Sequence, residues 1–383
     1  MYIEVRKAAF VNKGAELMLR SILQRVSEEY PHAKFVMEPN KHAPFEKRAK
    51  LGLYQKAFPG RYGLLPFASP TASILPTKLK RSYGIVTNRE IDIVLDASGF
   101  SYSDQLSGRS TQTLADLSKI WKRQGTKLIL MPQAFGPFTS SHTKNAIKVI
   151  VENANLIFAR EKTSYEHLVK IVGEQENIKI APDFTNLLDG VLPGDFDQDK
   201  YKFCIVPNNR MIEKTSELEK NAYMPFLKNC ANFLLEKQAK PFILIHEVER
   251  DRKIAEELSA SVNGALPIIE ESDPLKIKGI LGACSGTIGS RFHGLVSALS
   301  QGVPSLGTGW SHKYQSLFEE YSFEEGLVDI CSNSYKQILE LLIQDDSRRK
   351  IVEKLANKSI YLKDESRKMW LETFAVIEKL SIT

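Results

Sequence analysis

The residues of this chain best suited to chemistry are an arginine and a histidine two positions apart, Arg291 and His293. They follow the short run 286–289, which is typical of a strand, and precede small residues that predict a helix. At such a junction, free backbone N–H groups and the helix dipole favour an anion. A guanidinium can bind phosphate or carboxylate there, and an imidazole can exchange a proton near neutral pH. We predict a catalytic pair at this junction, with Ser290 beside it. The alternative is a helix-capping His293 and an Arg291 paired with an acid.

Other polar residues follow other predicted strands. Ligands of parallel α/β sheets gather where the strands end, so residues at these positions are candidates for binding. The candidates are Arg160, Asn208, Asn209, Arg210, His246 and Lys313. Asn12, Lys13 and Glu16 are further candidates, because they lie where the first predicted strand leads into the first helix.

The elements that would position these residues are apolar runs alternating with amphipathic helices. The runs lack strict alternation, which is typical of parallel strands covered on both faces. A first series lies at 2–5, 34–37, 91–95, 127–131, 156–159 and 178–181, and a second at 202–206, 241–245, 266–269, 286–289 and 303–306. The stretch 188–200 between them is rich in Gly, Asp and Pro, which favours a domain boundary.

Two such series predict an α/β protein with two doubly wound, Rossmann-like domains facing a cleft. We expect an N-terminal domain over 1–188, a C-terminal domain over 198–335 and C-terminal helices over 336–383.

Positive charge concentrates in the segment 41–89. The whole chain has a net charge of +6, whereas this segment carries ten Lys or Arg against one Glu. Its aromatic residues are Phe45, Tyr54, Phe58, Tyr62, Phe67 and Tyr83. Such a mixture suits anionic lipid headgroups or a phosphorylated glycan, although a solvated excursion is equally open. We expect no nucleic-acid partner, because the sequence contains no recognisable nucleic-acid motif. We predict that the segment lies beside the acceptor side of the cleft and meets an anionic, lipid-linked glycan or the membrane surface.

The distribution of apolar residues and cysteines indicates where in the cell the protein is expected. No stretch of 18 consecutive apolar residues occurs, which argues against a membrane-spanning helix. The first residues lack the apolar core of a secretory signal, so we expect a cytoplasmic protein, peripheral at most to the inner face of the membrane. The four cysteines are far apart and form no C-x-x-C pair, so we expect neither a disulfide framework nor a metal site.

The stretch SRFHGLVSALSQGVPSLG at 290–307 resembles the polysaccharide pyruvyl transferase family. Further family-like motifs follow in the family's order over about residues 8–315. They are FVNKGAE at 10–16, MPQAFGPF at 131–138, FAREKTS at 158–164, APDF at 181–184, HEVERD at 246–251 and WSHKY at 310–314.

This resemblance implies a fold similar to GT-B glycosyltransferases and transfer of enolpyruvate from phosphoenolpyruvate to a glycan or precursor sugar, ending in a pyruvate ketal. It implies no cofactor. His293 would then donate the proton and Arg291, with Arg210, would hold the phosphate and carboxylate. Asn208, Asn209, Lys313 and Arg160 would assist, and Asn12, Lys13 and Glu16 would bind the acceptor. His246 with Asp251 would help to deprotonate the acceptor, with a purely structural role as the favoured alternative, and an ordinary turn is the alternative for Asn208 and Asn209. A nucleotide-sugar glycosyltransferase or epimerase, and a non-catalytic glycan-binding protein, stay open as alternatives.

Overall fold

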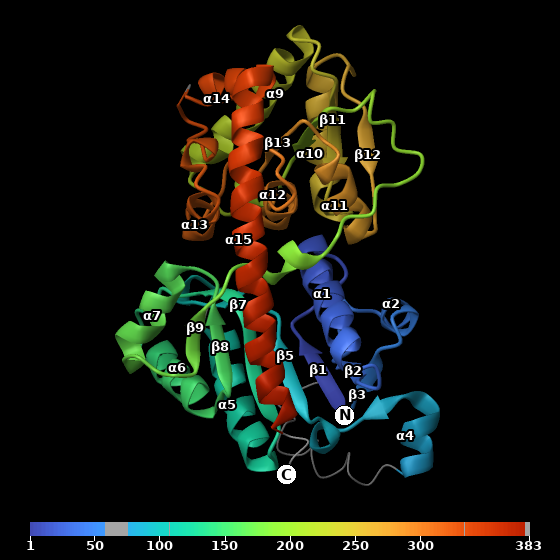
Figure 1. The fold of residues 1–383 in the computed structure, drawn as a ribbon, viewed down its shortest axis with the longest axis vertical. Coiled ribbons are helices and arrows are strands. Elements are labelled where there is room, and N and C mark those ends of the chain that lie inside the picture. The colour runs from blue at the N-terminus through green and yellow to red at the C-terminus, as the bar shows by residue number, and fades with distance from the viewer. Residues whose placement is uncertain (58–75, 107, 333, 380–383) are drawn as a thin grey trace. The chain divides into compact units, whose positions relative to one another are not determined.

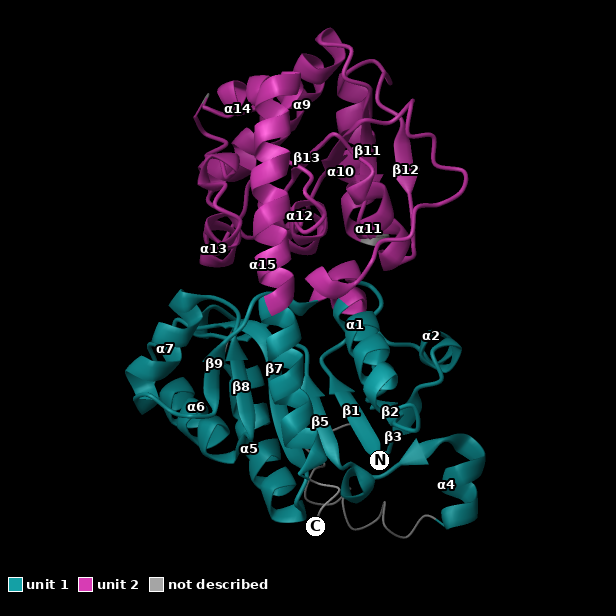
Figure 2. Cartoon of the chain, viewed as in Figure 1, with its two compact units in different colours: residues 1–11, 18–184, 365–383 teal, residues 12–17, 185–364 magenta. Residues whose placement is uncertain are grey.

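The computed structural model describes residues 1–57, 76–106, 108–332 and 334–379 (Figure 1). These residues form two compact units (Figure 2). Unit 1 comprises Met1–Val11, Met18–Phe184 and Glu365–Thr383, and unit 2 comprises Asn12–Leu17 and Thr185–Asp364. The first turn of the first helix therefore belongs to unit 2, while the rest of that helix belongs to unit 1.

Unit 1 is built on a parallel sheet whose main path runs β4-β3-β2-β1-β5-β7-β8-β9, with β6 paired to β7. The strands are β1 (Tyr2–Arg6), β2 (Lys34–Met37), β3 (Tyr54–Lys56), β4 (Ile85–Val86), β5 (Ile93–Asp96), β6 (Phe100–Tyr102), β7 (Lys127–Phe135), β8 (Leu156–Ala159) and β9 (Ile178–Ile180). The central strands β1, β5, β7 and β8 are almost completely buried, as expected for parallel strands covered on both faces.

Helices and short 3₁₀ turns connect these strands. They are α1 (Lys13–Glu29), α2 (Phe45–Lys50), α4 (Thr77–Tyr83), η2 (Asn88–Glu90), η3 (Asp104–Leu106), α5 (Arg109–Gln124), α6 (Ser141–Asn153), α7 (Lys162–Val172) and η4 (Phe184–Leu187). Local sequence explains several boundaries. The Ser140 hydroxyl accepts a hydrogen bond from the Thr143 amide and caps α6. Gly125, with a φ of 79°, ends α5 in the left-handed conformation that glycine adopts without strain.

Unit 2 contains a five-stranded parallel sheet in the order β12-β11-β10-β13-β14. Its strands are β10 (Phe203–Val206), β11 (Pro241–Ile245), β12 (Ile268–Glu270), β13 (Gly286–Gly289) and β14 (Ser305–Gly307). Its helices are α8 (Arg210–Glu213), α9 (Glu217–Glu236), α10 (Val248–Ser261), α11 (Pro274–Gly282), α12 (Phe292–Leu299), α13 (His312–Glu320), η5 (Glu324–Gly326) and α14 (Tyr335–Ile343).

A long C-terminal helix, α15 (Asp345–Glu378), contributes residues to both units. Its last turns complete the core of unit 1, where the Trp370 ring packs edge-on against Phe184 at 6.0 Å between centroids. Phe374 packs in the same manner against Tyr30 at 5.8 Å. Trp370 is fully buried, so these residues are an integral part of the unit 1 core.

The two parallel α/β sheets and the C-terminal helices confirm the predicted fold class. Within the described ranges, every helix is too short or too polar to span a membrane. Strands β3, β4 and β6, of three, two and three residues, were not predicted, and the first two lie in the basic segment 41–89. The predicted contact residues Phe58, Tyr62 and Phe67 of that segment lie outside the described residues.

The described parts of the basic segment reach both edges of the unit 1 sheet. Residues 40–43 follow β2 at the carboxyl edge, where the Phe10 amide donates a hydrogen bond to the His42 carbonyl. Helix α4 leads through Gly84 directly into β4, so α4 ends at the amino edge. Only the first part of the segment therefore lies at the sheet edge where ligands of parallel α/β proteins bind.

Candidate active site

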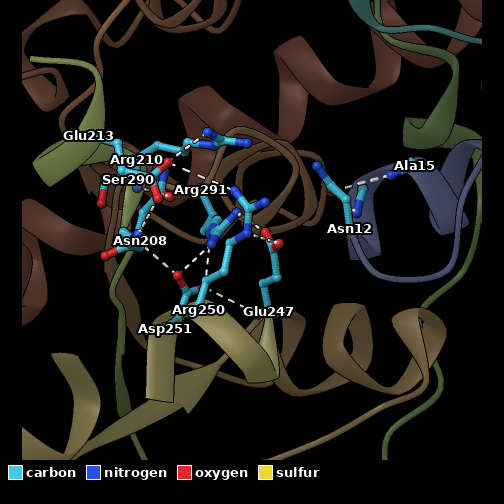
Figure 3. Close-up of polar contacts among 12 residues, drawn as sticks. Asn12, Ala15, Asn208, Arg210, Glu213, Glu247, Arg250, Asp251, Ser290 and Arg291 are labelled. Atoms are coloured by element: carbon cyan, nitrogen blue, oxygen red, sulfur yellow. Dashed lines mark hydrogen bonds and ion pairs between the residues drawn. The ribbon is translucent and has the colours of Figure 1, made fainter. Parts of the chain in front are cut away.

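The centre of the unit 2 sheet is a topological switch point. The chain passes from β10 to β11 on one side, while β13, the other neighbour of β10, leads to β14 on the opposite side. Loops that leave the carboxyl ends of such neighbouring strands diverge and open a binding site between them. Asn208, Asn209 and Arg210 follow β10, and Ser290 and Arg291 follow β13. Figure 3 shows Asn208, Arg210, Ser290 and Arg291.

Hydrogen bonds between uncharged groups hold these two loops together. The Asn208 Nδ2 group donates to the Ser290 carbonyl at 2.5 Å, and the Tyr314 hydroxyl donates to the same carbonyl at 3.0 Å. The Tyr223 hydroxyl lies 2.5 Å from Ser290 Oγ and accepts a hydrogen bond from the Asn208 amide. Burial raises the pKa of Tyr223, so its hydroxyl keeps its proton. Asn208 and Ser290 therefore build the site rather than face away from it.

Arg291 is buried and lies between two carboxylates. Its Nε donates to Asp251 Oδ2 at 2.9 Å, and its Nη2 also donates to Asp251. Its Nη1 donates to Glu247 Oε2 at 2.6 Å. Burial lowers the pKa of the guanidinium, but the two carboxylates outweigh it and raise that pKa overall. Three of the five guanidinium N–H groups are thus used within the protein.

Asp251 connects three segments of the site. Besides Arg291, it accepts hydrogen bonds from the Asn209 amide at 3.0 Å and the Glu247 amide at 3.1 Å. Burial raises its pKa, and the charge of Arg291 opposes this increase. The general-base role that the sequence suggested for Asp251 with His246 would compete with these contacts, because both carboxylate oxygens already accept hydrogen bonds.

His293 lies in the first turn of α12 and packs against the first turn of α1, which belongs to the same unit. A Cβ atom built on Gly14 would lie 2.2 Å from His293 Nδ1, so only glycine allows the ring to lie there. The ring also meets Phe292 edge-on at 5.4 Å between centroids. Contacts with α1 and with Phe292 therefore both restrict the imidazole.

The first turn of α1 brings three predicted residues to unit 2. Asn12 Oδ1 accepts hydrogen bonds from the amides of Gly14 and Ala15, which caps the helix (Figure 3). Lys13 and Glu16 form a buried ion pair of 2.9 Å. The sequence-based boundaries place these three residues in the N-terminal domain, whereas in the structure they cluster with unit 2.

His246 follows β11 and is only 4% exposed. Its pKa lies well below the usual value, first because of burial and then because of the positive charges of Arg291, His293 and Lys13. Within the described residues, its Nδ1 has no hydrogen-bond partner. His246 is thus a neutral imidazole with one ring nitrogen not engaged by the fold.

Two further cations lie in the first turns of short helices, α8 and α13. Lys313, in α13, lies over the rings of Phe292, Trp310 and Tyr314, with its Nζ 5.0 to 5.4 Å from their centroids. Arg210 is about one-third exposed and pairs with Glu213 at 2.6 Å. Aromatic faces thus stabilise the charge of Lys313, whereas a carboxylate stabilises that of Arg210.

The predicted site residues thus divide between the units. Unit 2 holds Asn12, Lys13, Glu16, Asn208, Asn209, Arg210, His246, Ser290, Arg291, His293 and Lys313. Arg160 lies in unit 1, where it follows β8 directly and pairs with Asp183 at 3.4 Å. Among the described residues, no group of three or more His, Cys, Asp or Glu could hold a metal ion.

Sequence analysis assigned no role to Glu247, Tyr223 or Tyr314. Glu247 carried a signal that could have been used, because two ionisable residues, His246 and Glu247, directly follow a buried strand. Tyr223 lies in a helix, and nothing in its local sequence distinguishes it from an ordinary core residue. Tyr314 is the last residue of the family-like motif WSHKY, which could have been used as a signal.

Comparison with solved structures identifies the fold. A putative UDP-N-acetylglucosamine 2-epimerase from Listeria monocytogenes is 13% identical with a TM-score of 0.60, and the match covers 99% of this chain and 97% of that chain. Anabaena HepE in complex with UDP and glucose is 12% identical with a TM-score of 0.58, covering 98% and 100%. The Neisseria meningitidis UDP-GlcNAc 2-epimerase bound to UDP-GlcNAc is 10% identical with a TM-score of 0.59, covering 98% and 100%. These similarities show a shared GT-B-like fold.

Comparison at the level of sequence bears on the family as well as on the fold. No curated protein sequence matches the chain. The family model for polysaccharide pyruvyl transferases matches residues 12–312, a range that begins at the first turn of α1 and ends at the start of α13. This match covers well over half of the chain, contains the stretch 290–307 and the motifs between 131 and 251, and overlaps the motifs at 10–16 and 310–314. The chain therefore belongs to the polysaccharide pyruvyl transferase family, an enzyme family.

Proposed function

We propose that the chain transfers the pyruvyl group of phosphoenolpyruvate to hydroxyls of a glycan or polysaccharide-precursor sugar, forming a ketal and releasing phosphate. Family membership supports the reaction class. The observation that carries the assignment of the site is the position of His293 at the switch point, held against Gly14 and beside the neutral, buried His246. The acceptor we favour is a sugar or a lipid-linked glycan.

The reaction makes defined demands on protein groups. A proton must reach the methylene carbon of phosphoenolpyruvate, which creates an oxocarbenium-like carbon. Two acceptor hydroxyls form the two new C–O bonds, and the bond to the phosphate oxygen breaks. Of the two hydroxyl protons released, one balances the proton gained by the new methyl group and the other leaves with phosphate. The site therefore needs an acid near the methylene, a base near the acceptor and cations for phosphate and carboxylate.

We assign the acid to His293, because its ring is fixed at the start of a helix where an anion is favoured. A bound anion stabilises the protonated imidazole, which is the form that the first step requires. A positioned acid of this kind contributes about 10²–10⁴ in rate. His246 is our candidate for the base, because its neutral form is favoured and its Nδ1 is not engaged.

The anionic groups of the donor need cationic donors. We propose Arg210 and Lys313 as direct contacts, with Asn209 and the backbone N–H groups at the start of α12. Arg291 supplies positive charge and orders the loops after β11 and β13, because three of its N–H groups bind Glu247 and Asp251. This refines the simpler expectation that Arg291 itself clamps the phosphate.

We propose that unit 1 provides the acceptor side, with Arg160 at the carboxyl end of β8 as one contact, and that Asn12, Lys13 and Glu16 complete it. The C-terminal domain predicted over 198–335 would hold the donor. No metal or cofactor is needed for this chemistry.

The test is His293→Ala, with His293→Gln as a variant of similar size. Both are expected to lower kcat by two to four orders of magnitude, while phosphoenolpyruvate binding measured by calorimetry changes little. Transfer is followed by phosphate release and by mass spectrometry of the acceptor. Near-normal turnover by either variant would remove His293 from the acid role. Tight binding of UDP, without binding of phosphoenolpyruvate, would instead favour a nucleotide-sugar enzyme.

A further inference from the structure

Two short helices of unit 1 expose apolar side chains to solvent. Helix α4 has no buried residue, and its Leu79 and Tyr83 are 41% and 69% exposed. Residues four apart lie on one face of a helix, so these two side chains form one apolar strip. Helix α2 buries only Arg48 and exposes Phe45 to 62%. Packing against the described part of the protein therefore explains neither the composition of α4 nor the exposure of Phe45.

Positive charge surrounds these apolar side chains. The 13 residues of the two helices contain six Lys or Arg and one acid, Glu46. Lys80 is paired with Glu90, and Arg48 donates hydrogen bonds to the Ala43 carbonyl and to Gln55. The remaining basic residues, Lys47, Lys50, Lys78 and Arg81, are exposed. Like charges gathered in this way repel one another unless a counter-charge is near.

The fold brings both helices to one side of unit 1. Helix α2 leads into β3 and α4 leads into β4, and these two strands are neighbours at the end of the sheet order (Figure 1). Gly84, which follows α4, also lies beside the Tyr54 ring of β3. The exposed apolar and basic side chains thus belong to the same margin of the sheet.

We propose that this margin, and α4 above all, docks the protein on an anionic phospholipid bilayer. Leu79 and Tyr83 would enter the interface between headgroups and acyl chains, where a tyrosine keeps its hydroxyl in water. Lys78 and Arg81 would contact the headgroup phosphates, with Lys47, Lys50 and Phe45 of α2 as further contacts. Stable peripheral binding generally requires an apolar and an electrostatic contribution together, and this margin offers both.

The apolar strip decides between a membrane and a soluble polyanion. A nucleic acid or an anionic polysaccharide would bind through the cations alone, so it would not account for the exposed side chain of Leu79. The interface of a bilayer accepts such a side chain and supplies the counter-charge in the same place. The proposal rests on the described residues of α2 and α4 and does not depend on the proposed function.

The test is sedimentation of the full chain with vesicles of pure phosphatidylcholine and of phosphatidylcholine with phosphatidylglycerol. We expect binding to the anionic vesicles only, weakened by salt. The double variant Lys78→Gln/Arg81→Gln should bind about thirtyfold more weakly, because each cation near an anionic surface contributes about fivefold. Leu79→Ser/Tyr83→Ser should lose vesicle binding but keep its affinity for heparin.

Matched controls are available on α15. Arg349→Gln/Lys350→Gln removes two exposed charges, and Ile360→Ser/Tyr361→Ser removes two exposed apolar side chains. Both should bind vesicles like the parent chain, and pyruvyl transfer to a soluble acceptor should be unchanged in all four variants. Equal losses in the α4 and α15 variants would overturn the proposal, since binding would then follow net charge or hydrophobicity alone.

A second readout covers the case in which an α4 variant does not fold. A fluorophore on Leu79→Cys, in a Cys331→Ser background that removes the exposed native thiol, should shift to shorter wavelength on anionic vesicles. A fluorophore whose emission does not move while the protein sediments with the vesicles would contradict insertion of α4. Sedimentation with neutral vesicles to the same extent would contradict the electrostatic part.

Discussion

The contact between Gly14 and His293 offers a direct test of the site. The Cβ atom of an alanine at position 14 would lie 2.2 Å from Nδ1, 2.6 Å from Cγ and 3.0 Å from Cβ of His293. Ordinary contacts of this kind begin at 3.4 Å. The imidazole must therefore retreat by about 1 Å, and a displacement of that size in an active site can cost about 10²-fold in rate. We expect Gly14→Ala to lower kcat by about two orders of magnitude.

Stability gives an independent measure of the same contact. Alanine is a better helix former than glycine by about 0.5–1 kcal/mol, so a substitution into open space would stabilise the protein. Gly14→Ala is expected to lose this gain, because the new methyl group displaces a packed ring. Gly194→Ala, in a turn rather than a helix, is the control for the added methyl group, since no heavy atom lies within 4 Å of the place that group would take and its φ lies outside the left-handed region. It should retain full activity.

The assay compares kcat, phosphoenolpyruvate affinity and thermal midpoint for both glycine variants. In a double variant with His293→Ala, the effect of Gly14→Ala on kcat should disappear, because both changes act through the same ring. If Gly14→Ala kept a kcat within about twofold of Gly194→Ala, either the contact or the catalytic role of His293 would be wrong.

Two further predictions concern the cations of the site. Arg291→Ala leaves the buried carboxylate of Asp251 without its cation, whereas Glu247 keeps Arg250 at 3.2 Å, and breaking a buried ion pair typically costs about 3–5 kcal/mol. In a unit of roughly 190 residues, this lowers the thermal midpoint by about 6–20 °C. Loss of Arg291 raises the pKa of Asp251 further. A carboxyl whose pKa is raised in the folded state destabilises the fold above that pKa, so the loss of stability caused by Arg291→Ala should become smaller as pH falls. Calorimetry at several pH values measures this loss of stability. A loss that does not change with pH would argue against the ion pairs as its cause. Lys313→Met should raise KM for phosphoenolpyruvate about tenfold with kcat nearly unchanged, and Lys313→Arg should reverse part of this increase in KM. A decrease in kcat alone would contradict the role of Lys313 in binding phosphoenolpyruvate.

Much of the fold could be predicted because its strands are long enough to show a pattern. The runs at 127–131 and 156–159 are buried on both faces, and their lack of alternation indicated parallel strands correctly. Strands of two or three residues, such as β3 and β4, are too short for any periodicity to be visible. Their place in the sheet follows from the strands beside them rather than from their own residues.

The site was predictable only in part, because the partners of a side chain depend on strand order. Position after a strand was enough to select His246, Arg291 and His293. The ion pairs of Arg291 join residues about 40 positions apart, and they exist because β11, β10 and β13 are adjacent in that order. No local pattern encodes this order. The clustering of Asn12 and Lys13 with unit 2 is likewise a property of the assembled chain.

The make-up of unit 1 has a consequence for synthesis on the ribosome. Its core includes Trp370 and Phe374, which pack on Phe184 and Tyr30. The strands of unit 1 emerge first but cannot complete their core until the last turns of α15 have left the exit tunnel. Unit 2, apart from one turn of α1, is continuous from Thr185 to Asp364 and is synthesised before this last part of unit 1. The nascent unit 1 therefore stays incomplete, with apolar surface exposed to chaperones, throughout the synthesis of unit 2.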